Sequence, residues 1–190
     1  MFRCPGFHRA SYVVSSDNHV HITENLSGEP RPGPLERRTR LRTMSATIDI
    51  GAAPQEVWAI LTDLGRYREW NPLYVEAAGN VAVGQRITLR SKHPANGRLM
   101  TVKPEITTAL PGTELRWTSR LPGIISGEHS FTLTATDSGT RVVQSETFQG
   151  LLTRFSGKTF ANAEASFQAL NQALKQRAEA RADPPAGSAS

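Results

Sequence analysis

The stretch IDIGAAPQEVWAILTDLGRYREWNP, residues 48–72, decides how the fold is read. Its first residues alternate like the end of a strand, and the pattern becomes helical at Pro54, a residue that suits the first turn of a helix. Apolar residues then recur at helical spacing, namely Val57, Trp58, Ile60, Leu61 and Leu64. A second short helix over 66–70 must end before Pro72, because the residue that precedes a proline disfavours α geometry. The stretch therefore predicts a strand followed by two short helices.

The chain after Pro72 alternates in polarity, as half-buried strands do. Turn residues such as Gly79–Asn80, Pro111–Gly112 and Asp137–Gly139 divide this region. The sequence predicts six strands, at roughly 73–78, 85–91, 98–108, 113–119, 126–136 and 140–149. Because the connections are short, we expect neighbouring strands to pair antiparallel.

A long helix is predicted from between residues 151 and 158 to about residue 180. Its apolar residues recur at intervals of three and four, namely Phe160, Ala163, Phe167, Leu170 and Leu174. One face of an antiparallel sheet needs a cover, and this helix is the obvious one.

The domain is expected to span residues 44–181. Residues 1–43 show no sustained period and contain the Pro/Gly cluster SGEPRPGP at 27–34. They are interpreted either as a mis-annotated extension upstream of a true start at Met44, or as a genuine disordered or targeting tail. Residues 182–190, ADPPAGSAS, are expected to form a disordered tail.

Composition narrows the function classes. The net charge is +5, of which +3 lies in residues 1–43, and the rest shows no basic stripe with interleaved aromatics, so nucleic-acid binding is disfavoured. No apolar run approaches the roughly 20 residues that span a bilayer, so no integral membrane association is expected. The single cysteine, Cys4, is compatible with a cytoplasmic location. No metal site and no cofactor are expected, since HVH at 19–21 has no third ligand nearby.

Four segments carry a resemblance to a known superfamily: residues 48–72, PGTELRW (111–117), GEHSFTL (127–133) and SETFQGLL (145–152). In this order they resemble the SRPBCC superfamily, the START-like or polyketide cyclase/dehydrase-like helix-grip proteins, and among them small bacterial members of unassigned activity. The resemblance implies an α+β fold of order β-α-α-β6-α, with a curved seven-stranded antiparallel sheet wrapped around the C-terminal helix and a cavity between them. The scaffold serves many functions, so no catalytic residues are transferred.

The expected cavity is lined by large apolar residues and a few polar ones, as small-molecule pockets usually are. We expect Trp70 and Tyr74 near the entrance. The other predicted ligand-binding residues are Leu89, Trp117, His129, Phe131, Glu146, Phe148, Phe160 and Phe167. The predicted function is binding of a hydrophobic or amphipathic small molecule, lipid or polyketide-like, by a monomer or homodimer. For each aromatic and aliphatic residue, plain core packing is the alternative.

An inward-facing histidine and glutamate are predicted on the hairpin GEHSFTLTATDSGTRVVQSETFQGLL (127–152). If Ala135 faces Thr140, then His129 meets Glu146, and directly opposed side chains lie about 5 Å apart at Cβ. This pair is interpreted as a structural pair, as the polar anchor of a ligand, or as a proton-transfer pair.

The alternative function is a polyketide cyclase or dehydratase that uses the same cavity. It would need a further acid or base, and the candidates are Tyr67, Tyr74 and Arg116, although the alternation places Arg116 on the outer face. A weaker alternative is a chaperone co-factor that uses Arg86 and Arg90 on the outer face of the sheet.

Overall fold

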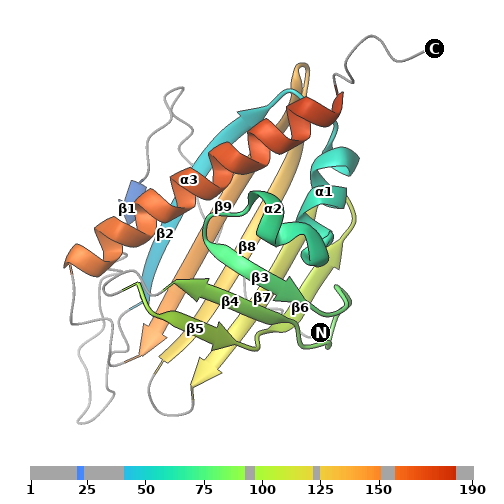
Figure 1. Ribbon diagram of the computed structural model, residues 1–190. Helices are drawn as coiled ribbons and strands as arrows, with labels where there is room; N and C mark the ends of the chain where they lie inside the picture. The colour runs from blue at the N-terminus through green and yellow to red at the C-terminus, as the bar shows by residue number, and fades with distance from the viewer. Residues whose placement is uncertain (1–20, 24–40, 93–96, 122–124, 151–156, 183–190) are drawn as a thin grey trace, which may run out of the picture.

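The computed structural model describes residues 21–23, 41–92, 97–121, 125–150 and 157–182, which form two antiparallel sheets and a set of helices (Figure 1). The larger sheet has the order β1-β2-β9-β8-β7-β6, and the smaller has the order β3-β4-β5. The bounds of the larger sheet are β1 (His21–Thr23), β2 (Leu41–Ile50), β9 (Gly139–Gly150), β8 (Ile125–Thr136), β7 (Glu114–Leu121) and β6 (Glu105–Leu110). The smaller sheet consists of β3 (Tyr74–Ala78), β4 (Thr88–Lys92) and β5 (Leu99–Val102).

The helices cover one face of the larger sheet. They are α1 (Pro54–Thr62), the short 3-10 helix η1 (Leu64–Arg66), α2 (Tyr67–Trp70) and α3 (Gly157–Ala182). In Figure 1, α3 runs diagonally across β2 and β9, while the smaller sheet crosses in front of the long strands. This is the predicted α+β helix-grip architecture, and the C-terminal helix is confirmed.

The strand predicted over 98–108 is divided in two by Lys103 and Pro104. Proline has no N–H for the ladder, which interrupts a strand. At this break the two sheets stay joined, because the Ile87 N–H donates to the Pro104 carbonyl at 3.0 Å and the Ile106 N–H donates to the Gln85 carbonyl at 2.9 Å. The smaller sheet is therefore a folded-over continuation of the larger one.

Strand β1 was not indicated by the sequence. Its three residues pair with Thr43–Ser45 of β2, which itself begins at Leu41. The other edge of β2 pairs with β9, so β1 occupies an edge that backbone hydrogen bonding leaves open. A three-residue strand is too short to show an alternation in the sequence. The domain boundary at Met44 stays a prediction.

Helix α2 ends at Trp70, and Asn71 and Pro72 lie in the turn that leads into β3. The Asn71 backbone is extended, with ψ at 113°, and its side chain is buried. Its Oδ1 accepts hydrogen bonds from the N–H groups of Leu73 at 3.0 Å and Tyr74 at 2.9 Å. The motif therefore serves the fold, since it sets the direction in which β3 leaves the helix.

The core lies between the larger sheet and the layer formed by α1, α3 and the smaller sheet. The helical stripe is confirmed on α3, where Phe167, Leu170 and Leu174 are buried. The predicted alternation on β8 and β9 is confirmed as well. Buried residues on these strands are His129, Phe131, Leu133, Thr140, Val142 and Gln144.

Candidate functional site

The β8–β9 hairpin has the predicted register. His129 pairs with Glu146, Phe131 with Gln144, and Leu133 with Val142. The turn itself is tight, because Thr136 and Gly139 also pair and leave two residues between them. Since paired residues share a face, His129, Gln144 and Glu146 all point toward α3.

The imidazole of His129 is enclosed by aromatic rings, and its side chain is 2 % exposed. It stacks on the indole of Trp117 with ring centroids 4.7 Å apart. Phe167 from α3 meets it edge-on at 5.2 Å, and Phe131 lies at 5.0 Å. The predicted residues from β7, β8 and α3 are thus brought together around one histidine.

Both ring nitrogens of His129 face polar side chains from β9. Nε2 lies 3.2 Å from Nε2 of Gln144, and Nδ1 lies 3.5 Å from Oε2 of Glu146. An amide nitrogen can only donate, so His129 Nε2 is the acceptor and the proton of the neutral ring is on Nδ1. Nδ1 is thus the ring nitrogen nearer to Glu146, and it makes no hydrogen bond within the described part of the chain. The predicted pair is therefore within one-water reach, with a separation longer than a good hydrogen bond.

Two polar residues of this layer were missed as site residues by the sequence analysis, Gln144 and Asn171. Asn171 Nδ2 donates to the carbonyl of Ala46 at 3.3 Å, and Ala46 is the Cα partner of Gln144 on the neighbouring strand. The signals were present: Gln144 lies between Val142 and Glu146 in the alternation, and Asn171 is four residues after Phe167 on the helical stripe.

Three buried polar atoms in this layer have no hydrogen-bond partner within the described part of the chain. They are Nδ1 of His129, Oε1 of Gln144 and Oδ1 of Asn171. Leaving a buried polar group without a partner costs about 1–3 kcal/mol. We call the row of His129, Gln144, Glu146 and Asn171 the polar row.

The phenol of Tyr74 belongs to the same environment and lies deeper than the expected entrance position, because its side chain is buried. Its ring centroid is 6.4 Å from that of His129 and 6.3 Å from that of Trp117. Burial, reinforced by the negative charge of Glu146 and by the repulsion that an ionised Tyr67 would exert, raises the pKa of Tyr74 well above its usual range. Tyr74 therefore stays protonated at neutral pH, where it can donate a hydrogen bond but cannot act as a base.

The remaining predicted residues divide into core and periphery. Leu89 is almost fully buried in the main core, and Trp70 packs partly buried against it, with its ring edge-on to Tyr67 at 5.3 Å. Phe148 is half-buried beside the smaller cluster of Met44, Ala46 and Phe167. Phe160 is on α3 but lies outside the residues whose side chains are described.

The inner layer is half-open toward the end of β9. The Glu146 side chain is 23 % exposed, and Phe148 beyond it is half-buried. On the facing sheet, Ser91 pairs with Tyr74 and with Met100, which is 39 % exposed. Tyr74 points inward, so its partners Ser91 and Met100 share that face. The polar row thus adjoins a partly exposed side of the layer.

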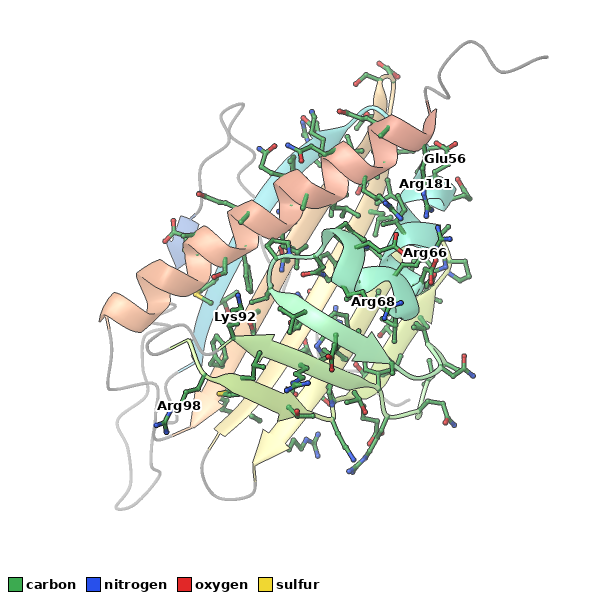
Figure 2. The ribbon with its side chains drawn as sticks, in the orientation of Figure 1. Glu56, Arg66, Arg68, Lys92, Arg98 and Arg181 are labelled. Carbon is green, nitrogen blue, oxygen red and sulfur yellow. The ribbon has the colours of Figure 1, made fainter. Side chains whose placement is uncertain are left out.

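A separate hollow of about 500 Å³ lies on the outer face of the smaller sheet. It is lined mainly by Arg68, Glu76, Thr88, Arg90, Leu99 and Thr101. Figure 2 labels Arg68, one of these lining residues. Arg90 forms an ion pair with Glu76 at 3.1 Å. This hollow does not contact the polar row, so we do not assign it to the predicted cavity.

With this geometry in place, the chain can be compared with known protein families. The family described as polyketide cyclase / dehydrase and lipid transport matches residues 42–179. The chain belongs to this family. The match covers every element from β2 to α3, so family membership rests on the whole fold. Comparison with curated proteins gives no significant match.

Solved structures of the same architecture span the domain. The Zhui aromatase/cyclase from Streptomyces sp. R1128 is similar with a TM-score of 0.64 and 17 % identity, over 78 % of this chain and 100 % of that one. A START superfamily protein from Mycobacterium smegmatis has a TM-score of 0.58 and 14 % identity, over 72 % of this chain and 97 % of that one. Protein MLL2253 from Mesorhizobium loti has a TM-score of 0.57 and 23 % identity, over 75 % of this chain and 99 % of that one. At these identities the likeness shows the fold alone.

Among the described residues, no helix has both the length and the hydropathy needed to cross a membrane.

Proposed function

We propose that this protein binds a hydrophobic or amphipathic small molecule, lipid or polyketide-like, against the inner face of β8 and β9 beneath α3. Aromatic side chains of Tyr74, Trp117 and Phe167 would contact its apolar part. The polar row would orient its polar group. Family membership supports this class of ligand, because the family is described by polyketide cyclisation, dehydration and lipid transport.

One observation carries the proposal: three adjacent buried polar groups lack partners in the described chain. Folded proteins pair the great majority of their buried polar groups. Gln144 Oε1 and Asn171 Oδ1 are acceptors. A ligand hydroxyl that donates to either oxygen would remove the free-energy cost of leaving that buried acceptor without a partner. A ligand without a polar group would gain only the aromatic contacts.

Binding of Nile red, a neutral fluorescent probe for apolar sites, tests the proposal. The polar row is tested with 1-naphthol, whose hydroxyl can donate to Gln144 Oε1, and Gln144→Ala should weaken its binding several-fold because the substitution removes that acceptor. Gln149→Ala is the matched control, since Gln149 is on the same strand but exposed. No Nile red fluorescence change with the native protein, and no small molecule retained in native mass spectrometry, would reject the proposal.

A cyclase or dehydratase activity is the alternative, favoured by the 3.5 Å approach of His129 Nδ1 to Glu146 Oε2. Of the predicted acid–base candidates, Arg116 is excluded, because it pairs with Glu114 and, at 2.9 Å, with Glu128 on the outer face. Tyr67 donates its hydroxyl to the Leu61 carbonyl at 2.6 Å. In this alternative, Glu146, whose side chain is partly exposed, would act as the base, and Tyr74 would donate a hydrogen bond.

Binding is favoured over catalysis because the ring of His129 is buried, its Nε2 is held by Gln144, and its Nδ1 lies 3.5 Å from Glu146, which is longer than a good hydrogen bond for proton transfer. A cyclase would be recognised by turnover of a poly-β-ketone analogue that Glu146→Gln abolishes. The cytoplasmic location, the monomeric or dimeric state and the lack of nucleic-acid binding stay predictions from the sequence.

A further inference from the structure

Glu146 brings a negative charge into a layer whose other described polar side chains include His129, Gln144 and Asn171. It pairs with His129 on one side and with Met44, which is buried, on the other. Its carboxylate is close enough to Tyr74 for its charge to contribute to the raised pKa of that phenol. The charge therefore acts on the same space in which the polar row lies.

No lysine or arginine is found among the buried residues of the described chain. Two arginines of the long strands are paired on the outer face, Arg116 with Glu128 at 2.9 Å and Arg141 with Asp49 at 2.7 Å. Lys92 and Arg98 of the β4–β5 hairpin are exposed at its end (Figure 2). Among the side chains that the structure describes, a ligand group that reaches the polar row therefore meets a carboxylate and no buried counter-ion.

We infer that the polar row excludes anions and that Glu146 is the residue that determines this specificity. The inference rests on the proposed function and narrows its ligands to those whose buried polar group is neutral or cationic. Two unit charges of like sign 4–5 Å apart repel strongly at the effective dielectric of a protein site. An anion would also lose its hydration without gaining a partner charge. A neutral hydroxyl has neither the repulsion nor the loss of ionic hydration, and it can donate a hydrogen bond to the side-chain oxygen of Gln144 or Asn171.

The exclusion applies to polar groups that enter the layer. A long-chain fatty acid could place its tail inside and leave its carboxylate near Lys92 and Arg98, so it does not test the inference. Compact bicyclic probes do, because their polar group is attached directly to the rings and has no long chain that could hold the two apart. Suitable probes are 1-naphthol, neutral at pH 7, and 1-naphthoate, an anion of nearly the same shape.

The experiment measures the affinity of both probes by isothermal titration calorimetry on the full chain. We expect native protein to bind 1-naphthol at least about tenfold more tightly than 1-naphthoate. Glu146→Gln keeps the side-chain shape and should bring the two affinities within about threefold, mainly by improving 1-naphthoate. Glu128→Gln is the matched control, since it removes the same charge from the outer face of β8 and should leave the ratio unchanged.

The outcomes separate the inference from the proposed function. Equal binding of the two probes by the native protein overturns the exclusion of anions, while binding itself would still support the proposed function. A ratio that Glu128→Gln changes as much as Glu146→Gln also overturns the role of Glu146. If neither naphthalene probe nor Nile red binds, the proposed function fails and the inference fails with it. The native comparison needs no variant, so misfolding of Glu146→Gln cannot hide the result.

Discussion

The ring of His129 lies flat on the indole of Trp117, with an interplanar angle of 1°. The two residues are cross-strand partners on β8 and β7, so the register of the sheet fixes the stack. The next strand over, β9, presents Gln144 and Glu146 to the ring edge. Three adjacent strands thus determine the position, the plane and the tautomer of one imidazole.

The first prediction concerns that tautomer. Because the Gln144 amide donates to Nε2, neutral His129 should carry its proton on Nδ1. Two-bond ¹⁵N–¹H correlation spectra of the imidazole distinguish the two tautomers directly. Gln144→Ala removes the donor and should shift the population toward the Nε2–H form. An Nε2–H ring in the native protein would show that the Gln144 amide has the opposite orientation.

The second prediction is a loss of stability at alkaline pH. Tyr74 and Tyr67 are buried, and burial is the first cause of the raised pKa in both. The unfolded chain releases each phenolic proton near pH 10 while the folded chain retains it, so stability falls as pH rises above about 10. Each tyrosine contributes about 1.4 kcal/mol per pH unit.

Tyr74→Phe keeps the ring packing and removes one of these two protons. Urea unfolding of both proteins between neutral pH and about pH 11 should give curves whose difference is flat up to pH 10. Above that, the native protein should lose about 1.4 kcal/mol per unit more than the variant. Parallel curves throughout would mean that Tyr74 is deprotonated as easily in the folded as in the unfolded state.

The sequence predicted most of the fold because its local signals agree with one another. Alternation on β8 and β9 placed His129 opposite Glu146, and a helical period placed Phe167 on the covered face. What it could not predict depends on partners far away in the chain. Asn171 became a site residue only because α3 crosses β2 at Ala46, and that crossing point is set by packing rather than by any local pattern.

The separate roles of Trp70, Asn71 and Pro72 could not be predicted from the sequence either. Trp70 was predicted at an entrance, yet it packs partly buried against Tyr67. Asn71 was assigned no role, yet its side-chain oxygen accepts two backbone hydrogen bonds that begin β3. The segment 70–72 is easily recognised in the sequence, yet it forms a structural turn. The residues of the polar row belong to no recognisable sequence motif.

The third prediction is that Phe167 supports the fold as well as the candidate site. Its side chain is 3 % exposed, clustered with Met44 and Ala46, and edge-on to His129. Phe167→Ala should cost about 3–5 kcal/mol in urea unfolding. Gln168→Ala is the control on the next, exposed position of α3 and should change stability by less than about 0.5 kcal/mol. A loss below about 1 kcal/mol for Phe167→Ala would contradict its place in the core.

The fourth prediction concerns Gly139, at the turn between β8 and β9. Its φ is +139°, a conformation that L side chains rarely adopt. A Cβ at this position would also overlap the backbone carbonyl oxygen of Ile50 and approach the backbone of Gly51 and Ala52. These neighbours are main-chain atoms, so they cannot rotate away as a flexible side chain would. Gly139→Ala must therefore displace the turn from the end of β2.

Gly84 provides the matched control, because its φ is +82° but a Cβ there would meet no atom within 4 Å. Gly84→Ala should show the backbone penalty alone, about 1–3 kcal/mol. Gly139→Ala should exceed it by at least about 1 kcal/mol, since the steric overlap with the β2 backbone is added. The difference in midpoint between the two variants in urea unfolding measures that overlap. Equal costs would show that the hairpin turn can move away from Ile50 freely, and with it the end of the strand pair that carries His129 and Glu146.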